Sequence, residues 1–285
     1  MNELNYSQVL TEALTEFGKG IQSCRIDEGK LPWCPMMPYV YPEYGYGKKI
    51  FYVGQDTFGW NLKLPEETKE NCFDFFFKCY DERRFDSYLE HNAGALSLDC
   101  RVYGWPNKPG SFWFGVNSLH LKLTKGRDPY DGLRDLSDDE LMLLNGIGYG
   151  NLNSIELPET LQKGDNNYWP GISKDEYWRI KDSSIATLDK LRHLLEAFHP
   201  DCVVITAWGT KSETEYFDGC DVSELAVDDG AFHGGMEVRS YLVSYKGQST
   251  RVFWTKHPTH WGWGWDNFSA NVNNLANYIN SSMGW

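Results

Sequence analysis

The segment that most constrains this chain is a short apolar strand followed at once by a glycine and two polar residues. Residues 50–53 read IFYV, and Gly54, Gln55 and Asp56 come directly after them. Such a run is typical of a buried strand that ends in a tight turn. Ligands of open parallel α/β sheets bind beyond the carboxyl ends of the strands, so Gln55 and Asp56 become candidates for a site. Taken alone, the same residues also fit a strand followed by an aspartate that caps a helix.

Further strands with polar residues at their ends follow along the chain. Residues 146–156 alternate between apolar and polar side chains and contain glycines. This pattern predicts a strand, with Asn151 at or near its end. Residues 202–207 (CVVITA) form another predicted buried strand, which closes on Trp-Gly-Thr. Two runs of alternating apolar and polar residues flank Lys246 and Gly247, which predicts a hairpin. The second run leads to His257.

Helices are predicted between and around these strands. Apolar side chains recur at helical spacing in residues 5–22 and 185–198, and a last helix is predicted over 266–279. Ser137 and Glu140 have the spacing of a capping box. This rhythm of strands and helices predicts an α/β fold, a three-layer α/β/α sandwich with a central, mostly parallel, four-stranded sheet. The 285 residues fit one domain, 1–285, with an insertion at about 65–135.

Two stretches lack such periodicity. Residues 31–47 hold four prolines and four tyrosines, and we expect them to form an irregular loop. Residues 213–229 are acidic, and we expect an exposed excursion there.

Charge and cysteine content limit the functional classes. The formal net charge of −13 argues against a nonspecific nucleic-acid binder, because phosphate binding relies on Lys and Arg. None of the seven cysteines forms a CxxC pair, so neither a zinc knuckle nor an iron–sulfur site is indicated. The start MNELNYSQ lacks an apolar signal-peptide core, and no apolar run approaches membrane-spanning length. We therefore expect a cytoplasmic protein with reduced thiols and no membrane partner.

The polar strand ends, taken in order, resemble the motifs of the uracil-DNA glycosylase superfamily. That superfamily has a GQDPYH-type motif, an LLLN-type strand, a VVFLLWG-type strand and an HPSPLS-type loop before a last helix. The corresponding segments here read VGQDTFG, GYGNLNS, VVITAWG and KHPTHWG, and NFSANVNNLANYI is similar to the closing helix. The resemblance covers roughly residues 31–280. It implies a DNA glycosylase that uses no metal or other cofactor.

The resemblance assigns catalysis to Asp56 and His257. Hydrolysis of an N-glycosidic bond passes through a cationic sugar, so a carboxylate at position 56 can position water and balance that charge. A histidine at position 257 can stabilise the departing anionic base. The alternatives are a helix cap for Asp56 and a hydrogen-bonded turn residue for His257. No lysine in the matched motifs is an evident Schiff-base nucleophile. We therefore expect a monofunctional hydrolase that leaves an abasic site.

Three residues are candidates for binding the extruded base. Asn151 is the expected reader, because a side-chain amide offers both a donor and an acceptor to the Watson–Crick edge of a pyrimidine. Gln55 and Phe58 are expected to contact the same base. Asn153 and Asn117 are rivals of Asn151, and Asn117 lies too early in the sequence to be the better candidate.

One departure from the superfamily bears on the substrate. Thr57, Phe58 and Gly59 stand where the superfamily has Pro-Tyr-His. Gly59 opens space beside the pyrimidine C5 position, so we expect a modified pyrimidine, such as a hypermodified cytosine of phage DNA. Some members of the superfamily are thought to act in defence against phage. Repair of uracil in DNA is the alternative.

The segment after His257 carries the expected DNA contacts. A Trp-Gly repeat places Trp261 and Trp263 where a wedge could fill the stack left by an extruded base. Packing on the final helix is the alternative for either tryptophan. No Asp or Glu occurs from residue 238 to 265, so we expect a basic strip that faces phosphates. The other expected DNA-binding residues are Arg251, Lys256, Thr259 and His260.

Two rival functions stay open on the sequence alone. One is a noncatalytic nucleic-acid-binding module of the same fold, and the other is an acidic interaction protein. We expect a monomer that binds DNA, and the sequence leaves open which base is excised and whether single or double strands are preferred.

Overall fold

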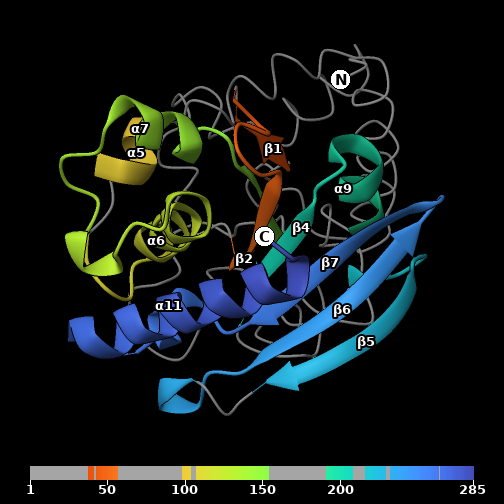
Figure 1. Ribbon diagram of the computed structural model, residues 1–285. Coiled ribbons are helices and arrows are strands. Elements are labelled where there is room, and N and C mark those ends of the chain that lie inside the picture. The colour runs from red at the N-terminus through yellow and green to blue at the C-terminus, as the bar shows by residue number, and fades with distance from the viewer. Residues whose placement is uncertain are drawn as a thin grey trace, which may run out of the picture.

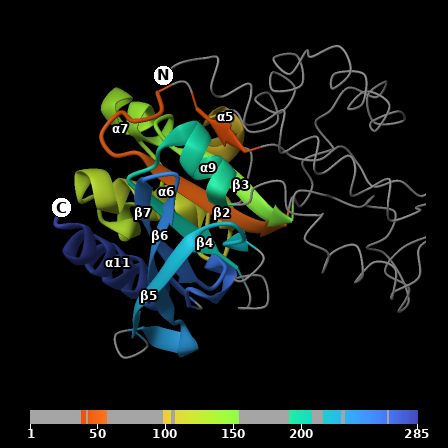
Figure 2. The same cartoon turned by 90° about the vertical axis from the view of Figure 1, so that its right-hand side faces the viewer.

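A single seven-stranded sheet forms the centre of the described part of the chain. The computed structural model describes residues 38–41, 43–56, 98–103, 107–153, 191–207, 216–228, 232–262 and 264–285, and every statement below concerns these residues. The strand order is β1-β3-β2-β4-β7-β6-β5; all strands except β3 are labelled in Figure 1, and β3 is labelled in Figure 2. The strands are β1 Tyr39–Val40, β2 Ile50–Asp56, β3 Gly148–Asn153, β4 Cys202–Thr206, β5 Asp221–Asp228, β6 Val238–Tyr245 and β7 Gln248–Thr255.

The four strands β3, β2, β4 and β7 are parallel and adjacent. Strands β1 and β6 pair antiparallel with β3 and β7, and β5 pairs antiparallel with β6. Figure 2 shows β2 and β3 running side by side in the same direction. The predicted α/β class is confirmed, but the predicted number of four strands was wrong, because three further strands extend the parallel core on both sides.

Helices flank this sheet in the described ranges. They are α5 Leu98–Tyr103, α6 Phe112–Lys125, α7 Asp138–Leu144, α9 Leu191–Phe198 and α11 Gly264–Met283. Single turns of 3-10 helix are η3 Pro129–Asp131, η6 His233–Gly235 and η7 Pro258–His260.

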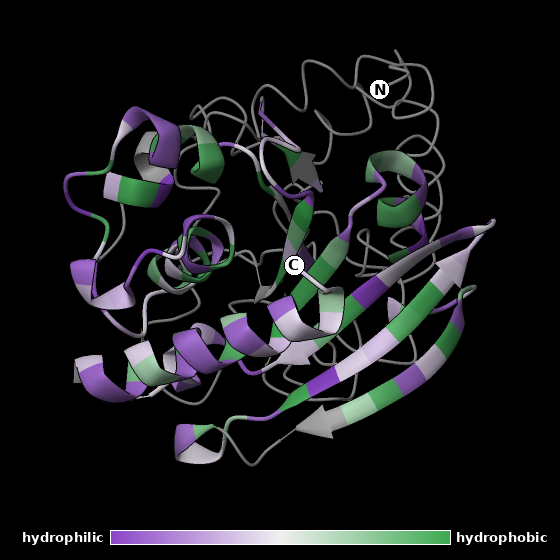
Figure 3. Cartoon of the chain, in the orientation of Figure 1, coloured by the Kyte–Doolittle hydropathy of each residue, from purple (hydrophilic) through white to green (hydrophobic). Residues whose placement is uncertain are grey.

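Alternate residues of the central strands build two separate cores. On β2, Ile50 and Tyr52 are buried with side chains of α6 and α11, whereas Phe51 and Val53 are buried with side chains of α9. Successive strand residues point to opposite faces of a sheet, so a strand that is apolar throughout must be covered on both faces. Figure 3 shows this apolar character in the central strands and the mixed, partly polar surface of α11. The described helices thus lie on both faces of the sheet.

Local signals in the sequence located several elements well. The helix predicted to end before Pro200 is α9 in its described part, and the last helix begins at Gly264 rather than at Asp266. Ser137 caps α7, with both hydrogen bonds of the capping box to Glu140 present. The hairpin turn at Lys246 and Gly247 has positive φ at both residues, as a two-residue turn between twisted strands requires.

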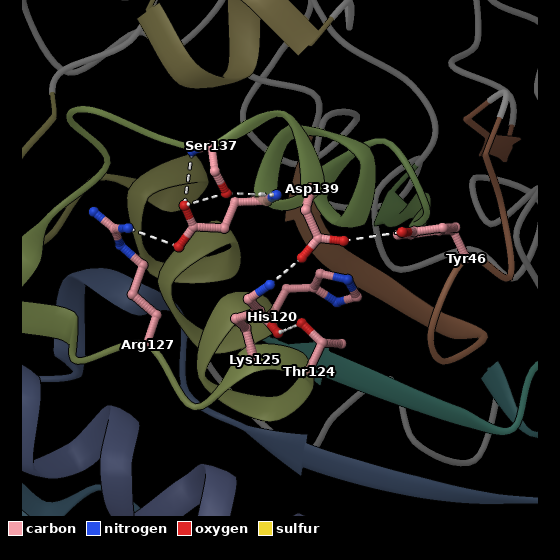
Figure 4. Close-up of polar contacts among 8 residues, drawn as sticks. Tyr46, His120, Thr124, Lys125, Arg127, Ser137 and Asp139 are labelled. Carbon is pink, nitrogen blue, oxygen red and sulfur yellow. Dashed lines mark hydrogen bonds and ion pairs between the residues drawn. The ribbon is translucent and has the colours of Figure 1, made fainter.

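Polar contacts fasten α7 to its neighbours (Figure 4). The Arg127 guanidinium donates to Glu140 at 2.7 Å, and the Tyr46 hydroxyl donates to Asp139 at 2.9 Å. Lys125, in the last turn of α6, forms an ion pair with Asp139. The Lys125–Asp139 pair is exposed and contributes little to stability, whereas the Arg127–Glu140 pair is largely buried, with 16% and 10% of the two side chains exposed.

Two expectations about irregular segments were wrong in part. Residues 221–228, within the expected acidic excursion, form β5, and residues 39–40, within the expected irregular loop, form β1. Strand β5 escaped prediction because six of its residues, 221–226, are exposed, so its sequence lacks the alternation of a half-buried strand. The helix predicted at residues 5–22 lies outside the described residues.

Helix α6 lies within the range expected to be an insertion, yet it packs in the core. Ten of its residues are buried, among them Val116, Leu119 and Leu121. It also packs against α11 and η7, so this helix helps to form the region around His257.

Candidate active site

The sheet brings the two predicted catalytic positions to the same edge. Val53, Ile205 and Trp254 lie in one row across β2, β4 and β7. Asp56, the last residue of β2, comes three residues after Val53. His257, just beyond β7, comes three residues after Trp254. One strand separates them, so their backbones are about 10 Å apart in the strand-to-strand direction. The side chains of Gln55 and Asp56 lie outside the described part of the structure, so only their backbone is placed.

Asn151 lies at the same edge, on β3. Its register partner on β2 is Gly54, and Asp56 pairs with Asn153. The Asn151 side chain is fully buried, and its Oδ1 accepts a hydrogen bond from the Tyr149 hydroxyl at 2.8 Å. The rival Asn117 is also buried, but it lies in the middle of α6 and donates to the carbonyl of Arg101. The geometry therefore favours β3 as the source of the amide nearest to Asp56.

The turn that follows His257 contacts its ring. The backbone N–H of Thr259 donates to His257 Nδ1 at 3.3 Å, and the Thr259 hydroxyl lies 3.0 Å from the same nitrogen. In the neutral imidazole, the nitrogen that accepts this hydrogen bond carries no proton, so this contact favours the tautomer with the proton on Nε2.

Phe112 joins this group from the start of α6. Its ring stacks on the His257 ring, with centroids 5.4 Å apart and planes at 30°. It also contacts Tyr149 edge to face, at 5.5 Å. Phe112 is not among the site residues expected from the sequence, because nothing in the pattern SFWF separates a site aromatic from a core aromatic. Only the position of α6 beside the end of β7 identifies Phe112 as a residue of the candidate site.

Close packing fixes the turn that carries His257. A Cβ on Gly115 would lie 2.6 Å from Pro258 Cβ, so α6 approaches the turn as closely as a glycine allows. The Trp261 indole donates to the Lys256 carbonyl at 2.7 Å, and Asn271 of α11 donates to the Trp261 carbonyl at 2.8 Å. These contacts therefore hold residues both before and after His257 in the sequence, namely Lys256, Pro258 and Trp261.

Trp261 itself is fully buried and stacks on Phe268. This is the packing alternative left open for Trp261, and insertion of its ring into DNA stays a prediction that this burial does not support. The indole N–H needs a buried acceptor and finds it in its own turn, which is the physical reason for its place in the core. Trp263 lies outside the described residues, as do Thr57, Phe58, Gly59 and residues 208–210.

The expected basic strip is spread over both ends of the β6–β7 hairpin. Lys256 lies next to His257, and its Nζ donates to the Gly235 carbonyl. Lys246 lies in the hairpin turn at the far end and pairs with Glu196 at 2.7 Å. Arg251 is the register partner of Cys202, the first residue of β4, and so lies near the amino ends of the parallel strands. Arg251 is the fourth of the eight residues of β7, whereas His257 lies just beyond the end of that strand.

Two more predicted DNA contacts lie at the His257 end. Thr259 is exposed, and His260 is half-buried in the same turn. Burial, together with the positive charge of Lys256, lowers the pKa of His260 below its usual value. A neutral His260 can exchange hydrogen bonds with a phosphate or a sugar, but it adds no charge to the surface.

Comparisons of the chain with protein-family models, with curated proteins and with solved structures find no match. Within the described residues, no helix is both long and apolar enough to cross a membrane. The same residues contain no group of three or more His, Cys, Asp or Glu side chains placed to hold a metal ion.

Proposed function

We propose that this chain is a monofunctional DNA glycosylase of the uracil-DNA glycosylase superfamily, built as a three-layer α/β/α sandwich and acting in the cytoplasm. It hydrolyses the N-glycosidic bond of an extruded pyrimidine and leaves an abasic site. The observation that carries the proposal is the placement of His257, whose Nδ1 accepts a hydrogen bond from the Thr259 N–H, at the same sheet edge as Asp56 and Asn151.

Each group at this edge has a chemical task in the proposed reaction. The Asp56 carboxylate positions water and stabilises the positive charge that develops on the sugar. The Nε2–H of His257 donates to the oxygen of the departing base, whose negative charge grows in the transition state. A neutral donor suits this task because the imidazole is already oriented by Thr259 and needs no proton before the reaction begins.

Binding of the base falls to Asn151 and Phe112. The Asn151 amide, fully buried, provides hydrogen bonds to the Watson–Crick edge. The half-buried Phe112 ring, stacked on His257, supplies a flat apolar surface on which a base can lie. Gln55 and Phe58 remain expected contacts of the same base.

The preferred substrate is a modified pyrimidine, with a C5 substituent accommodated beside Gly59. Defence against phage DNA that carries hypermodified cytosine is the biological role that we propose. Repair of uracil uses the same groups and is the second candidate.

The decisive experiment is to incubate the protein with three DNAs that contain uracil, 5-hydroxymethylcytosine or glucosylated 5-hydroxymethylcytosine, and to score abasic sites by alkaline cleavage. We expect cleavage of at least one modified-cytosine DNA and weaker cleavage of uracil DNA. Efficient action on uracil alone would assign the repair role. DNA binding without any base release would leave the noncatalytic binding module as the function.

A further inference from the structure

Tyr149 lies directly beside the proposed base reader. It precedes Asn151 by two residues on β3, so both side chains lie on the same face of the sheet. The Tyr149 side chain is buried, and its ring packs on Trp113 at 4.6 Å and on Phe112 at 5.5 Å. The ring is therefore fixed on two sides, and its hydroxyl meets Asn151 Oδ1 at 2.8 Å.

Gly54 lies beside the same amide oxygen of Asn151. A Cβ on Gly54 would lie 2.4 Å from Asn151 Oδ1 and 3.0 Å from the Tyr149 hydroxyl. The amide oxygen thus lies over β2, next to the phenol. The two ends of a planar amide diverge, so Nδ2, which carries two N–H donors, lies on the side away from Tyr149.

We propose that Tyr149 is a specificity-determining residue, whose hydroxyl fixes the amide orientation of Asn151 and thereby sets which pyrimidine edge the site accepts. This inference rests on the proposed function, because it takes Asn151 to be the base reader. It assigns to Tyr149 a positioning role, exerted through Asn151.

The chemistry of the two pyrimidine edges makes amide orientation decisive. Uracil presents an N3–H donor beside the O4 acceptor, whereas cytosine presents the N3 acceptor beside the N4 amino donor. An amide turned the wrong way leaves buried polar atoms unpaired, which costs about tenfold to 100-fold in affinity. A free asparagine can turn over and serve either base. If the Asn151 amide turned over, its Nδ2–H would donate to the Tyr149 hydroxyl instead, and the buried hydroxyl proton would need another acceptor.

Tyr149→Phe tests this proposal, with Tyr52→Phe as the matched control. Tyr52 is the register partner of Tyr149 on β2, it is fully buried, and its hydroxyl bonds to His120 at 3.1 Å rather than to Asn151. Each variant removes one buried hydroxyl and keeps the ring, so melting temperatures of the two show whether the fold is equally affected.

The readout is binding, which does not depend on turnover. Two single-stranded oligonucleotides carry either 2′-fluoroarabino-uridine or 2′-fluoroarabino-cytidine, which resist hydrolysis because the fluorine disfavours a cationic sugar. Fluorescence anisotropy gives the Kd of each. We expect the wild-type protein and Tyr52→Phe to bind one of them at least about tenfold more tightly, and Tyr149→Phe to bind both within about threefold.

An equal preference in wild type and Tyr149→Phe, or no preference in wild type, overturns the proposal. Failure of the proposed function is a separate result, because it shows as the absence of base release from cleavable DNA. The wild-type protein could prefer one base and Tyr149→Phe could lose that preference, while neither releases a base. That result would support the specificity role of Tyr149 and reject the proposed glycosylase activity.

Discussion

Gly54 and Asn151 are register partners on adjacent parallel strands, and a Cβ on residue 54 would lie 2.4 Å from the Asn151 amide oxygen. No real Cβ tolerates that distance, so a side chain on residue 54 must displace the amide. The glycine that ends the apolar run of β2 therefore makes room for a residue on another strand.

Gly54→Ala should reduce base release at least about tenfold, because the displaced amide no longer pairs with the base. Gly148→Ala is the control: its Cβ would collide with the Phe51 ring at 2.2 Å, near the start of β3. We expect both variants to lower the melting temperature, but only Gly54→Ala to lower base release in proportion to folded protein. Equal activity losses in both would contradict a specific role for Gly54.

Asp56→Asn should lower the rate of base release by at least about 100-fold and leave DNA affinity nearly unchanged. The substitution keeps the size of the side chain and removes the charge that stabilises the cationic sugar. Single-turnover kinetics give the rate, and anisotropy gives the affinity. A rate close to that of the wild-type protein would exclude Asp56 as a catalytic residue.

Gly115→Ala should lower the rate of base release about tenfold to 100-fold, because the added Cβ pushes on Pro258 and shifts the neighbouring His257. Ser118→Ala, one turn further along α6, is the control, since its buried hydroxyl has no hydrogen-bond partner in the described structure. Rates are compared at saturating DNA. An unchanged rate in Gly115→Ala would show that the turn adjusts without moving the histidine.

Trp261→Ala should destabilise the fold by about 3–5 kcal/mol, because it empties a buried indole site and removes the bond to Lys256. Trp265→Ala should cost less than about 1 kcal/mol, since that ring is 40% exposed. Urea denaturation measures both. A small effect of Trp261→Ala on stability, together with weaker binding to duplex DNA, would restore the wedge interpretation.

Burial, aided by the positive charges of Arg101 and Lys48, lowers the pKa of His120 from 6.5 to about 3. Between these two values the unfolded chain binds the proton and the folded chain does not, so stability rises with pH across that window. This residue alone should remove about 2 kcal/mol of stability between pH 7.5 and pH 5.

Urea denaturation at the two pH values, on the wild-type protein and on His120→Leu, measures this contribution as a difference. His199→Asn, at an exposed position whose positive φ asparagine tolerates, controls for the loss of a histidine as such. An identical pH dependence in wild type and His120→Leu would show that His120 is protonated in the folded state.

The sequence predicted those parts of the structure that depend on residues close to one another in the chain. The capping box at Ser137 and Glu140, the hairpin turn at Lys246 and the helix before Pro200 are local features, and each was predicted. The strand ending at Asp56 and the one containing Asn151 were also recognised, because buried strands are apolar runs that end in glycine or polar residues.

The rest depends on which elements become neighbours. Phe112 reaches His257 only because α6 packs beside the end of β7, and Tyr149 reaches Asn151 over a glycine of another strand. The burial of Trp261 follows from α11, whose Asn271 holds its carbonyl. No periodicity encodes such contacts, so sequence reasoning named the positions on strand ends but not the residues that orient them.

Strand β5 is the last strand on its side of the described sheet, and its sequence limits how far that sheet can grow. Asp221, Glu224 and Asp228 lie along it, and a register shift between Glu224 and Ala226 interrupts its pairing with β6. A second copy that docked edge to edge and antiparallel would bring like charges opposite one another on an irregular ladder. The Asp221 and Glu224 carboxylates and the irregular pairing of β5 therefore oppose self-association through this edge.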